Sequence, residues 1–437
     1  MVPENDLQKA FKAISDKRSR LDLLWRYVNG NQPLRYSTEK LRDAFGQINV
    51  HFEQNWCAVV LDAVLDRLVL KGWDMEKKVL NDILDEIWSR LSISLDAYDV
   101  HRAALATGEG YLIAWKTNND IEIYYNDPRL CHVFYDPERP KVKQFAAKWF
   151  RAEDGSHRMT LYYPDRLEHY TAPRKDTLIS YKAFIPGAPP TEPNPYGEIP
   201  VFHFRSPGEL SKILTLQDAV NKMLADMMVA AEFGAFMQRW IISTADPGDL
   251  KNAPRENWWI PAGDGSSQAS SVGQFAATPL DNYLGAIDKL AGAIAIISRT
   301  PKHYMFNTGA SLSGEALLAM EAPLMKKVKQ YQERLGIVWQ EVGCFILKLL
   351  EQKTEGVQAI WERAESVQPF TEAQSIQLEV ASGIPLITAL RRRGWGQDEI
   401  NSMLKDIAEE RASRKTVAQE TLSALRIGQE QSNEPTV

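Results

Sequence analysis

Apolar residues recur at helical spacing through the middle of the chain, between Pro207 and Leu350. Over residues 207–242 the steps between apolar or small positions alternate between three and four, which predicts a long helix that packs lengthwise on other helices. The stripe consists of Ile213, Leu216, Val220, Met223, Met227, Ala230, Gly234, Met237 and Ile241. Asp218, Lys222 and Asp226 share another face of this helix, and we expect that face to be solvated.

Two more helices are predicted after the first. Thr278-Pro279 is a typical helix start, because proline fits the first helical position, and we expect a helix over residues 278–299. Ser313 is a typical N-cap, and we expect a long helix over residues 313–353. Pro323 lies inside that helix, where proline removes a backbone hydrogen bond, so we expect a bend.

An insert and a loop connect these helices. Residues 243–277 contain Trp258, Trp259 and a Gly-Ser-rich segment, which predicts a small extended or hairpin module that projects from the helix pair. Residues 300–312 form the loop. Its candidate functional residues are Lys302, His303, Tyr304, Asn307 and Thr308. They offer a cation, an imidazole and polar groups that could contact phosphates weakly, although a plain connecting loop is the commoner structure.

The first 206 residues combine helices with β-rich segments. Helices are expected over residues 5–28, 55–73, 76–91 and 95–107. Short runs of β-branched and aromatic residues follow, separated by turn signals, and predict a mostly antiparallel sheet. The runs are residues 110–116, 121–125, 131–135, 144–150, 158–163, 167–171, 178–184 and 199–204. Residues 186–195 are rich in proline, and we expect a surface loop there.

The last part of the chain, residues 354–437, reads as helical with a polar tail. Helices are expected over residues 372–382 and 386–392, separated by Gly383-Ile384-Pro385, and a further helix over residues 397–411. The predicted fold class is therefore α+β.

Composition and charge exclude several classes of protein. The 437 residues carry a formal net charge of −6, which implies no general affinity for a polyanion. The three cysteines are scattered, which disfavours a structural zinc site or a disulfide framework and fits a reducing compartment. We expect no signal peptide and no membrane segment, because no apolar run reaches the roughly 20 residues that span a bilayer.

Motifs that carry chemistry are missing from the sequence. It contains no GxxxxGK[ST], HExxH, GxSxG or EF-hand pattern, and the seven histidines do not pair at metal-ligand spacing. We therefore expect no catalytic residues, no metal and no cofactor. Asp62 and Asp66 lie one turn apart beside Arg67, and we expect them to be solvated or ion-paired. Lys326-Lys327-Lys329 and Arg391-Arg392-Arg393 are expected to lie on solvated helix faces.

The order of these parts resembles a tailed-bacteriophage portal protein of the siphophage type. The segments that carry the resemblance are NWCAVVLDAVLDRLVLKGW at 55–73, GEGYLIAW at 108–115 and LSGEALLAMEAPLMKK at 312–327. Ala381-Ser382-Gly383-Ile384 and the segment 394–400 also look like the end of such a chain. The resemblance covers nearly the whole chain and depends on the order of its parts.

The resemblance implies a ring of identical subunits, usually twelve, at one vertex of the capsid. It implies a wing at 1–206, stem helices at 207–242 and 278–299, a clip at 243–277, a tunnel loop at 300–312, a long kinked helix returning to the wing at 313–353, and a crown and tail at 354–437. Asp218, Lys222 and Asp226 would then face a channel, and Met227, Ala230, Gly234 and Met237 would pack the stem. Trp258 and Trp259 would dock partners through the clip.

The partners that the resemblance implies are double-stranded DNA in the channel, the terminase large subunit, a head–tail adaptor, and the major capsid or scaffolding protein. The expected location is the virion, with assembly in the host cytoplasm. A stem that leans acidic fits this picture, because a channel through which DNA slides should not bind phosphates tightly. The family offers no catalytic residues to transfer.

Two other interpretations stay open at the level of sequence. One is a scaffold or head-completion protein that forms no ring, which light scattering would detect as a monomer. The other is a nucleic-acid-processing enzyme whose site is dispersed over the fold, which nuclease or NTPase activity of the purified chain would support.

Overall fold

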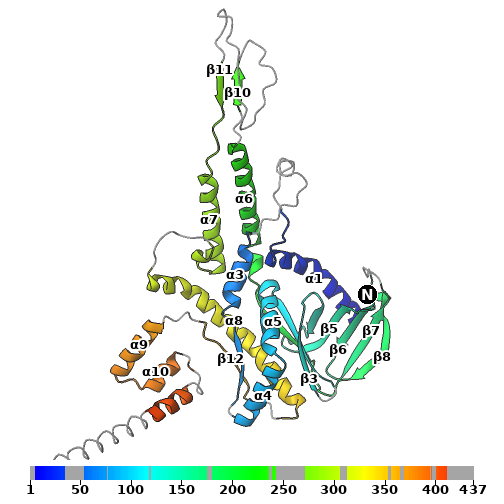
Figure 1. Cartoon of the computed structure of the whole chain (residues 1–437). Coiled ribbons are helices and arrows are strands. Elements are labelled where there is room, and N and C mark those ends of the chain that lie inside the picture. Colours follow the sequence, from blue (N-terminus) through cyan, green and yellow to red (C-terminus); the bar gives the residue numbers. More distant parts are fainter. Residues whose placement is uncertain are drawn as a thin grey trace, which may run out of the picture. The chain divides into compact units, whose positions relative to one another are not determined.

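The computed structural model of the chain describes most of its residues (Figure 1). They are residues 5–34, 54–75, 77–117, 120–174, 180–235, 239–242, 271–305, 313–352, 356–364, 369–393, 395 and 400–410. The chain divides into two compact units, Met1–Ala364 and Glu365–Val437. Helices and antiparallel strands are both abundant, which confirms a mixed α and β fold.

Among the described residues, four helices form the N-terminal part of the first unit. They are α1 (Asp6–Val28), α3 (Trp56–Leu65), α4 (Lys78–Arg90) and α5 (Ile93–Thr107). The Asn5 side chain caps α1 by accepting a 2.8 Å hydrogen bond from the backbone N–H of Gln8. Gly108 ends α5 with a φ of +92°, a left-handed conformation that suits glycine.

The helix predicted over residues 55–73 is wrong in its second half. The helix α3 ends at Leu65, and the chain then forms strand β1 (Leu70–Asp74), which pairs antiparallel with β12 (Gln358–Trp361). Gly72 has a φ of +143°, which no helix contains. Trp73 is buried and donates a 2.7 Å hydrogen bond from its indole nitrogen to the Trp339 carbonyl, so tertiary contacts select the strand.

Two antiparallel sheets make up the β-rich region. One has three strands in the order β3-β2-β9, and the other has five in the order β4-β5-β6-β7-β8. Their strands are β2 (Glu109–Thr117), β3 (Asp120–Asn126), β4 (Cys131–Tyr135), β5 (Lys143–Arg151), β6 (His157–Tyr162), β7 (Arg166–Ala172), β8 (Ile185–Pro193) and β9 (Val201–Arg205). Antiparallel pairing throughout both sheets confirms the pattern that most of the alternating runs predict. The run at 178–184 is an exception, because Tyr181–Ala183 forms a 3-10 turn and the next strand begins at Ile185.

The proline-rich segment is the strand β8 and not a loop, which corrects the sequence-based expectation for residues 186–195. It pairs with β7, with Ile185 opposite Thr171 and Pro193 opposite Arg166. Proline lacks a backbone N–H and is tolerated at the edge of a sheet, where one side of the strand has no partner strand. The five-stranded sheet ends at β8, so the prolines lie where the fold tolerates them.

The helix α1 joins two hydrophobic cores. Its first half buries Leu7, Ala10 and Ile14 against the five-stranded sheet, together with Trp149 and Phe184. Its second half buries Leu21, Leu24, Tyr27 and Val28 in a larger core, which also holds residues of α3, α5, α6 and α8. One helix therefore anchors the sheet to the helical part of the unit.

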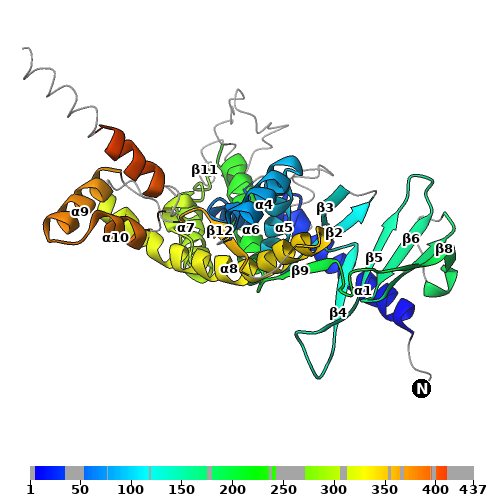
Figure 2. The ribbon, with the colours of Figure 1, turned by 90° about the horizontal axis from the view of Figure 1, so that it is seen from below.

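A long helix, α8 (Gly314–Leu349), runs through this larger core (Figure 2). The Ser313 side chain caps it by accepting a hydrogen bond from Ala316, as the sequence predicts, and the helix continues through Pro323. Gly343 permits close packing, because a Cβ atom there would lie 2.7 Å from Val357 and 2.9 Å from the Trp73 indole nitrogen. Near this close contact, the aromatic rings form a cluster. Its members are Trp73, Trp88, His101 and Trp339.

Two helices extend from the body as a hairpin. A short 3-10 turn (Leu210–Lys212) leads into α6 (Leu214–Ala235), and α7 (Asp281–Ser298) returns beside it. The first predicted stem helix, over residues 207–242, is too long, because Arg239–Ile242 is the strand β10, which pairs with β11 (Ser271–Gln274). Likewise, α7 begins after Leu280 and not at Thr278-Pro279.

The second unit contains α9 (Pro369–Ala381), α10 (Leu386–Arg392) and a helix over residues 400–410. Gly383, with a φ of +94°, lies in the predicted break between the first two. The guanidinium of Arg393 donates to both carboxylate oxygens of Glu379, at 2.9 and 3.0 Å, and so joins the loop after α10 to α9.

The buried His101 makes the stability of the body depend on pH. The Trp339 indole donates a 2.8 Å hydrogen bond to His101 Nε2, and burial lowers the pKa of His101 to about 3. An unfolded histidine titrates near 6.5, so the unfolded chain binds more protons below that pH and the free energy of unfolding falls as the pH drops toward 4. The variant His101→Gln, which keeps an acceptor for Trp339, should lower this dependence by up to about one proton.

The measurement is the free energy of unfolding in guanidinium, followed by tryptophan fluorescence, at several values between about pH 4 and pH 7. Burial also lowers the pKa values of His132 and His203, so part of the dependence should remain in the variant. An unchanged slope in His101→Gln would contradict the assignment.

Candidate functional site

The candidate site is the α6–α7 hairpin together with the segment that follows α7. The two helices run side by side, and a Cβ atom at Gly234, near the end of α6, would lie 3.6 Å from the Ala277 side chain that precedes α7. The helices are therefore antiparallel, and Gly234 packs on its own chain. Beyond them, β10 and β11 pair from Arg239 opposite Gln274 to Ile242 opposite Ser271.

Burial along the hairpin decreases away from the body. On α6, Val220 and Ala225 are fully buried, whereas Met227 and Ala230 are half-buried and Met228 is 46% exposed. On α7, Ile287, Ala291 and Ile294 are buried, but Leu284 is 44% exposed. The part of the hairpin nearest the body thus has a core within this chain, although Ile296 and Ile297 in the last turn of α7 are exposed there, and the far part also exposes apolar side chains.

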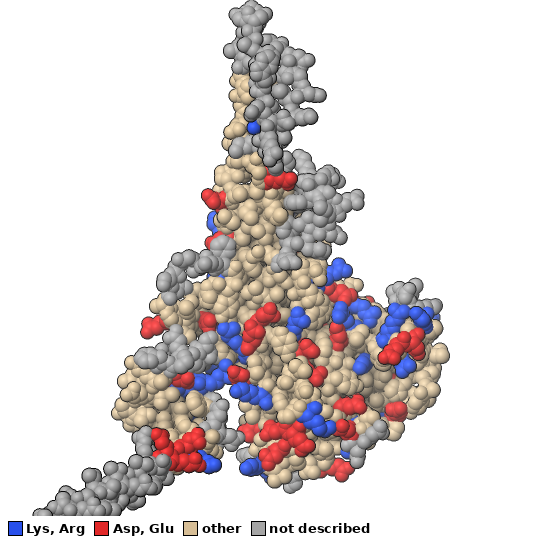
Figure 3. Space-filling model, viewed as in Figure 1, with Lys and Arg blue, Asp and Glu red and all other residues tan. Residues whose placement is uncertain are grey.

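The hairpin carries few cations. Across α6 and α7 there are two lysines against five aspartates and glutamates, and the surface of the hairpin in the view of Figure 3 is mostly uncharged. Lys222 and Asp226 form an ion pair one helical turn apart. Each of these charges is therefore partly neutralised within the chain.

Asp218 does not lie on a solvated face, which corrects the sequence-based expectation for this residue. It is 4% exposed, and it accepts a 2.6 Å hydrogen bond from the Tyr27 hydroxyl of α1. The neighbouring Gln217 is also hydrogen-bonded: its side-chain amide donates to the Gln54 carbonyl and to the Asn221 side chain. A buried carboxylate with a hydrogen-bond donor belongs to the joint between stem and body and cannot face a channel.

The segment after α7 begins with a short turn that is held by α7 at one end and by the body at the other. In the 3-10 turn Lys302–Tyr304, the Lys302 ammonium lies 2.8 and 2.9 Å from the two carboxylate oxygens of Asp288. The Tyr304 hydroxyl accepts a 2.7 Å hydrogen bond from Arg67 and donates a 2.8 Å one to Glu321 of α8. His303 lies between them, half-buried with its ring against Tyr304.

Five of the sequence-predicted residues lie outside the described residues, so the structure does not place them. They are Met237, Trp258, Trp259, Asn307 and Thr308. Among the placed residues, Lys302 forms an ion pair with α7 and Tyr304 forms a hydrogen bond with α8. The sequence did not indicate either contact.

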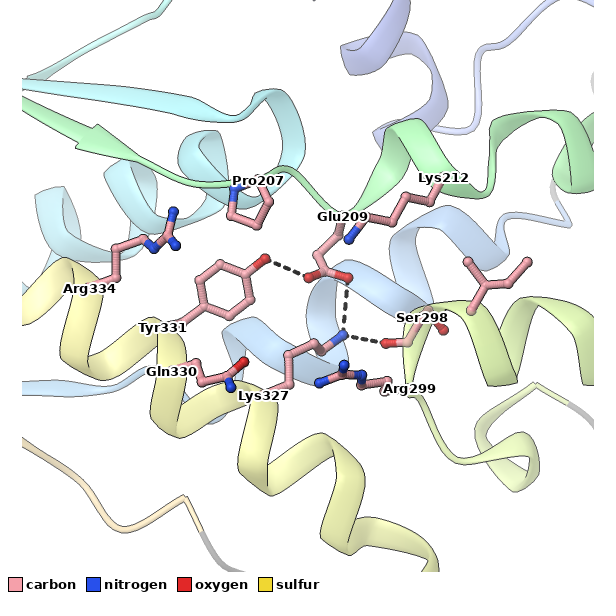
Figure 4. A pocket seen from close by; sticks show the side chains of 10 residues that line it. Pro207, Glu209, Lys212, Ser298, Arg299, Lys327, Gln330, Tyr331 and Arg334 are labelled. Atoms are coloured by element: carbon pink, nitrogen blue, oxygen red, sulfur yellow. Dashed lines mark hydrogen bonds and ion pairs between the residues drawn. The ribbon is translucent and has the colours of Figure 1, made fainter.

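A buried ion pair at the base of the hairpin is the feature that sequence reasoning missed. Lys327 of α8 and Glu209 lie 3.0 Å apart, with side chains only 9% and 3% exposed (Figure 4). The Tyr331 hydroxyl donates a 2.6 Å hydrogen bond to Glu209, and Lys327 also donates to the Ser298 carbonyl at the end of α7. Three segments that are distant in sequence therefore meet at the Lys327 ammonium.

The lysine run at 326–329 is thus only partly solvated, which corrects its reading as a surface face. Lys327 follows Leu324 and precedes Tyr331 at helical spacing, so it lies on the buried stripe of α8. That spacing was the available signal in the sequence. Burial lowers the pKa of Lys327, while Glu209 opposes the shift. Burial also raises the pKa of Tyr331, so the hydroxyl remains a donor.

A pocket opens beside this pair, with a volume of about 220 Å³. Its lining includes Glu209, Lys212, Arg299, Lys327, Tyr331 and Arg334. Among the described residues, no group of three or more His, Cys, Asp or Glu side chains is placed to hold a metal ion. Within the same residues, no helix is long and apolar enough to cross a membrane.

Comparison with known proteins identifies the family. Residues 65–416 match the model of the family described as "Phage portal protein, SPP1 Gp6-like". The chain is also 20% identical over 372 residues to a protein named "Portal protein" from Mycobacterium phage D29, with 76% of this chain and 75% of that protein covered. The chain belongs to the phage portal protein family. Proteins of this family are structural components of the phage particle.

The Tyr304 contacts generate a prediction about stability. Replacement by phenylalanine removes the hydroxyl that links Arg67 to Glu321, at a cost of about 1 kcal/mol, because both partners are charged but partly solvated. The matched control is Tyr283→Phe on α7, whose hydroxyl has no hydrogen bond within the described residues. Guanidinium unfolding should separate the two variants, and equal midpoints would count against the Tyr304 link.

Proposed function

We propose that this chain forms a closed ring at one vertex of a phage capsid, through which double-stranded DNA is packaged and later ejected. The single observation that carries the proposal is the projecting α6–α7 hairpin in a chain of the portal family. Apolar residues remain exposed on the far half of that hairpin, among them Met228 and Leu284. Copies of the chain would cover them, because exposed apolar surface of this kind favours association.

The charge of the hairpin supports its role as the stem that lines the channel. Each phosphate that a protein neutralises adds affinity and salt dependence, so a stem with two lysines and five carboxylates would let DNA slide. Lys222 and Asp226 are the candidates for facing the channel, and both are paired. Met227, Ala230, Gly234 and Met237 are candidates for packing the stem, although Gly234 already packs on Ala277.

The segment 300–312 would be the tunnel loop at the narrowest part of the channel. Lys302 and Tyr304 fix the start of this loop to α7 and α8. A fixed loop would keep the same position while DNA moves past it. Lys302, His303, Asn307 and Thr308 would form a polar girdle whose phosphate contacts are transient and sensitive to salt.

The remaining parts have proposed partners of their own. The clip, residues 243–277, would dock the terminase large subunit and then the head–tail adaptor. The wing, residues 1–206, would contact the major capsid or scaffolding protein, and the crown would lie inside the capsid. The ring is proposed to hold about twelve subunits, by analogy with the family, and to assemble in the host cytoplasm. Light scattering of the purified protein tests the ring directly, and a monomer at micromolar concentration would refute it.

Lys302→Glu should hinder the retention or translocation of DNA. The substitution places a ring of carboxylates near the passing phosphates, and like charges repel. It also removes the ion pair with Asp288, so the control is Lys302→Gln, which loses the pair without adding a negative charge. The length of packaged DNA in proheads built with each variant is the measurement. Full-length, stably retained genomes in Lys302→Glu, with normal rings, would rule out the girdle.

The clip tryptophans provide a separate prediction. Trp258 and Trp259 are candidates for docking, because tryptophan is enriched among residues that dominate binding at interfaces. The double alanine variant should form normal rings but lose at least about tenfold in affinity for the terminase large subunit. Affinity measured on assembled rings tests this, and wild-type binding by the double variant would show that these residues do not dock the motor.

A further inference from the structure

The pocket at the base of the hairpin holds more positive charge than the chain neutralises. Four cationic side chains, Lys212, Arg299, Lys327 and Arg334, line it together with one carboxylate, Glu209 (Figure 4). That carboxylate already accepts hydrogen bonds from Lys327 and Tyr331. The pocket is therefore positively charged, although the whole chain has a net charge of −6.

Three of the four cations have no anionic partner within the part of the chain that the structure describes. Lys212, Arg299 and Arg334 are exposed and make no ion pair there, whereas Lys327 is satisfied by Glu209. Guanidinium groups bind carboxylates in a bidentate geometry. The pocket therefore suits a carboxylate delivered from outside the chain.

Two isoleucines beside the pocket indicate that its ligand is carried by a protein. Ile297, which lines the pocket, is 47% exposed, and its neighbour Ile296 is 80% exposed. Both belong to the last turn of α7, and only Ser298 separates them from Arg299. A nucleic-acid backbone would bury little of this apolar surface, whereas a protein surface with an acidic group could cover it and enter the pocket.

A complementary acidic pair lies on α3. Asp62 and Asp66 are exposed, stand one helical turn apart and occupy the C-terminal end of the helix, where the helix dipole also disfavours negative charge. Burial and the nearby Asp66 raise the pKa of Asp62, with Arg102 opposing. The adjacent Arg67 does not neutralise them, because it is directed to Tyr304 and Glu321.

The two charged sites lie at a common level of the subunit. The helix α3 packs against α8 and the 3-10 turn Leu210–Lys212, and both of these elements also supply residues that line the pocket. Rotation about a ring axis parallel to the stem moves a residue sideways without changing its height. A site on one subunit can therefore meet only sites of the same level on the next subunit.

We propose that the acidic pair Asp62 and Asp66 of one subunit enters the pocket formed by Arg299 and Arg334 of its neighbour, with Ile296 and Ile297 covered by the contact. This inference rests on the proposed ring and names the charges that join its subunits. Through one interface it accounts for an acidic pair and for basic side chains that form no ion pair within the described residues. Each subunit would insert its acidic pair into the pocket of one neighbour and accept the acidic pair of the other neighbour in its own pocket.

Charge reversal tests the contact on the assembled full-length protein. Arg334→Glu should lower the fraction of subunits in rings at least about fivefold at low protein concentration and 0.1 M salt, because it places like charges together. Adding Asp66→Lys to the same chain should restore assembly. Lys141→Glu, at an exposed turn between β4 and β5, is the control with the same change in net charge. Mass photometry counts the rings.

The outcomes separate this inference from the proposed function. Wild-type rings together with unimpaired Arg334→Glu rings would overturn the contact and leave the ring intact. Loss of rings that Asp66→Lys fails to restore would overturn the pairing with α3, and the rescued double variant itself demonstrates correct folding. Normal rings that retain DNA poorly would assign the pocket to phosphate instead. A wild-type chain that forms no ring at all would refute the proposed function.

Discussion

A single buried ion pair determines how the α6–α7 hairpin meets the body of this protein. Glu209 lies 3.0 Å from the Lys327 ammonium, and it also accepts the Tyr331 hydroxyl. Burying one charge without its partner costs several kcal/mol, so each group requires the other. Removing either partner would leave an uncompensated buried charge, typically at about 3–5 kcal/mol, which exceeds the effect of most single contacts in the fold.

The same lysine also completes the end of a helix. The last carbonyl groups of α7 have no partner within the helix, and Lys327 donates to the Ser298 carbonyl among them. A cation there also interacts favourably with the helix dipole. Because Glu209 precedes α6, Ser298 ends α7 and Lys327 belongs to α8, these few hydrogen bonds fix both stem helices to the long helix of the body.

This joint leaves the far part of the hairpin with few buried apolar contacts of its own. Near the body, the helices bury Val220, Ile287 and Ile294 within the chain. Farther out, Met228 and Leu284 remain exposed in the single subunit, and few cations accompany them. The proposed ring would cover these side chains, and a hairpin with few cations is consistent with a channel that guides DNA without holding it.

Much of the fold follows from local sequence patterns. Helical periodicity predicts α1, α4, α5 and α8 close to their observed bounds, and alternating runs predict the antiparallel sheets. The errors occur where distant contacts decide the outcome. Leu70–Asp74 continues an apolar run that fits a helix, yet it pairs with a strand nearly three hundred residues later. No local pattern contains that partner.

The candidate site was predictable only in outline. The α6–α7 hairpin is visible in the order of helices and breakers, and the family model matches residues 65–416. The partners of individual charges are not visible. Asp218 and Lys327 look solvated by spacing, but Tyr27 and Glu209 reach them from elsewhere in the chain. Whether a charged residue is buried or exposed depends on the residues that surround it in the folded protein. A single sequence does not show which residues these are.

The most direct test of the account is a cryo-EM reconstruction of the purified, assembled protein. The account predicts a closed ring in which α6 and α7 of every subunit surround a central channel wide enough for a DNA duplex, with the turn at Lys302–Tyr304 at its narrowest part. A particle that is monomeric, or a ring whose hairpins point away from the central axis, would contradict it.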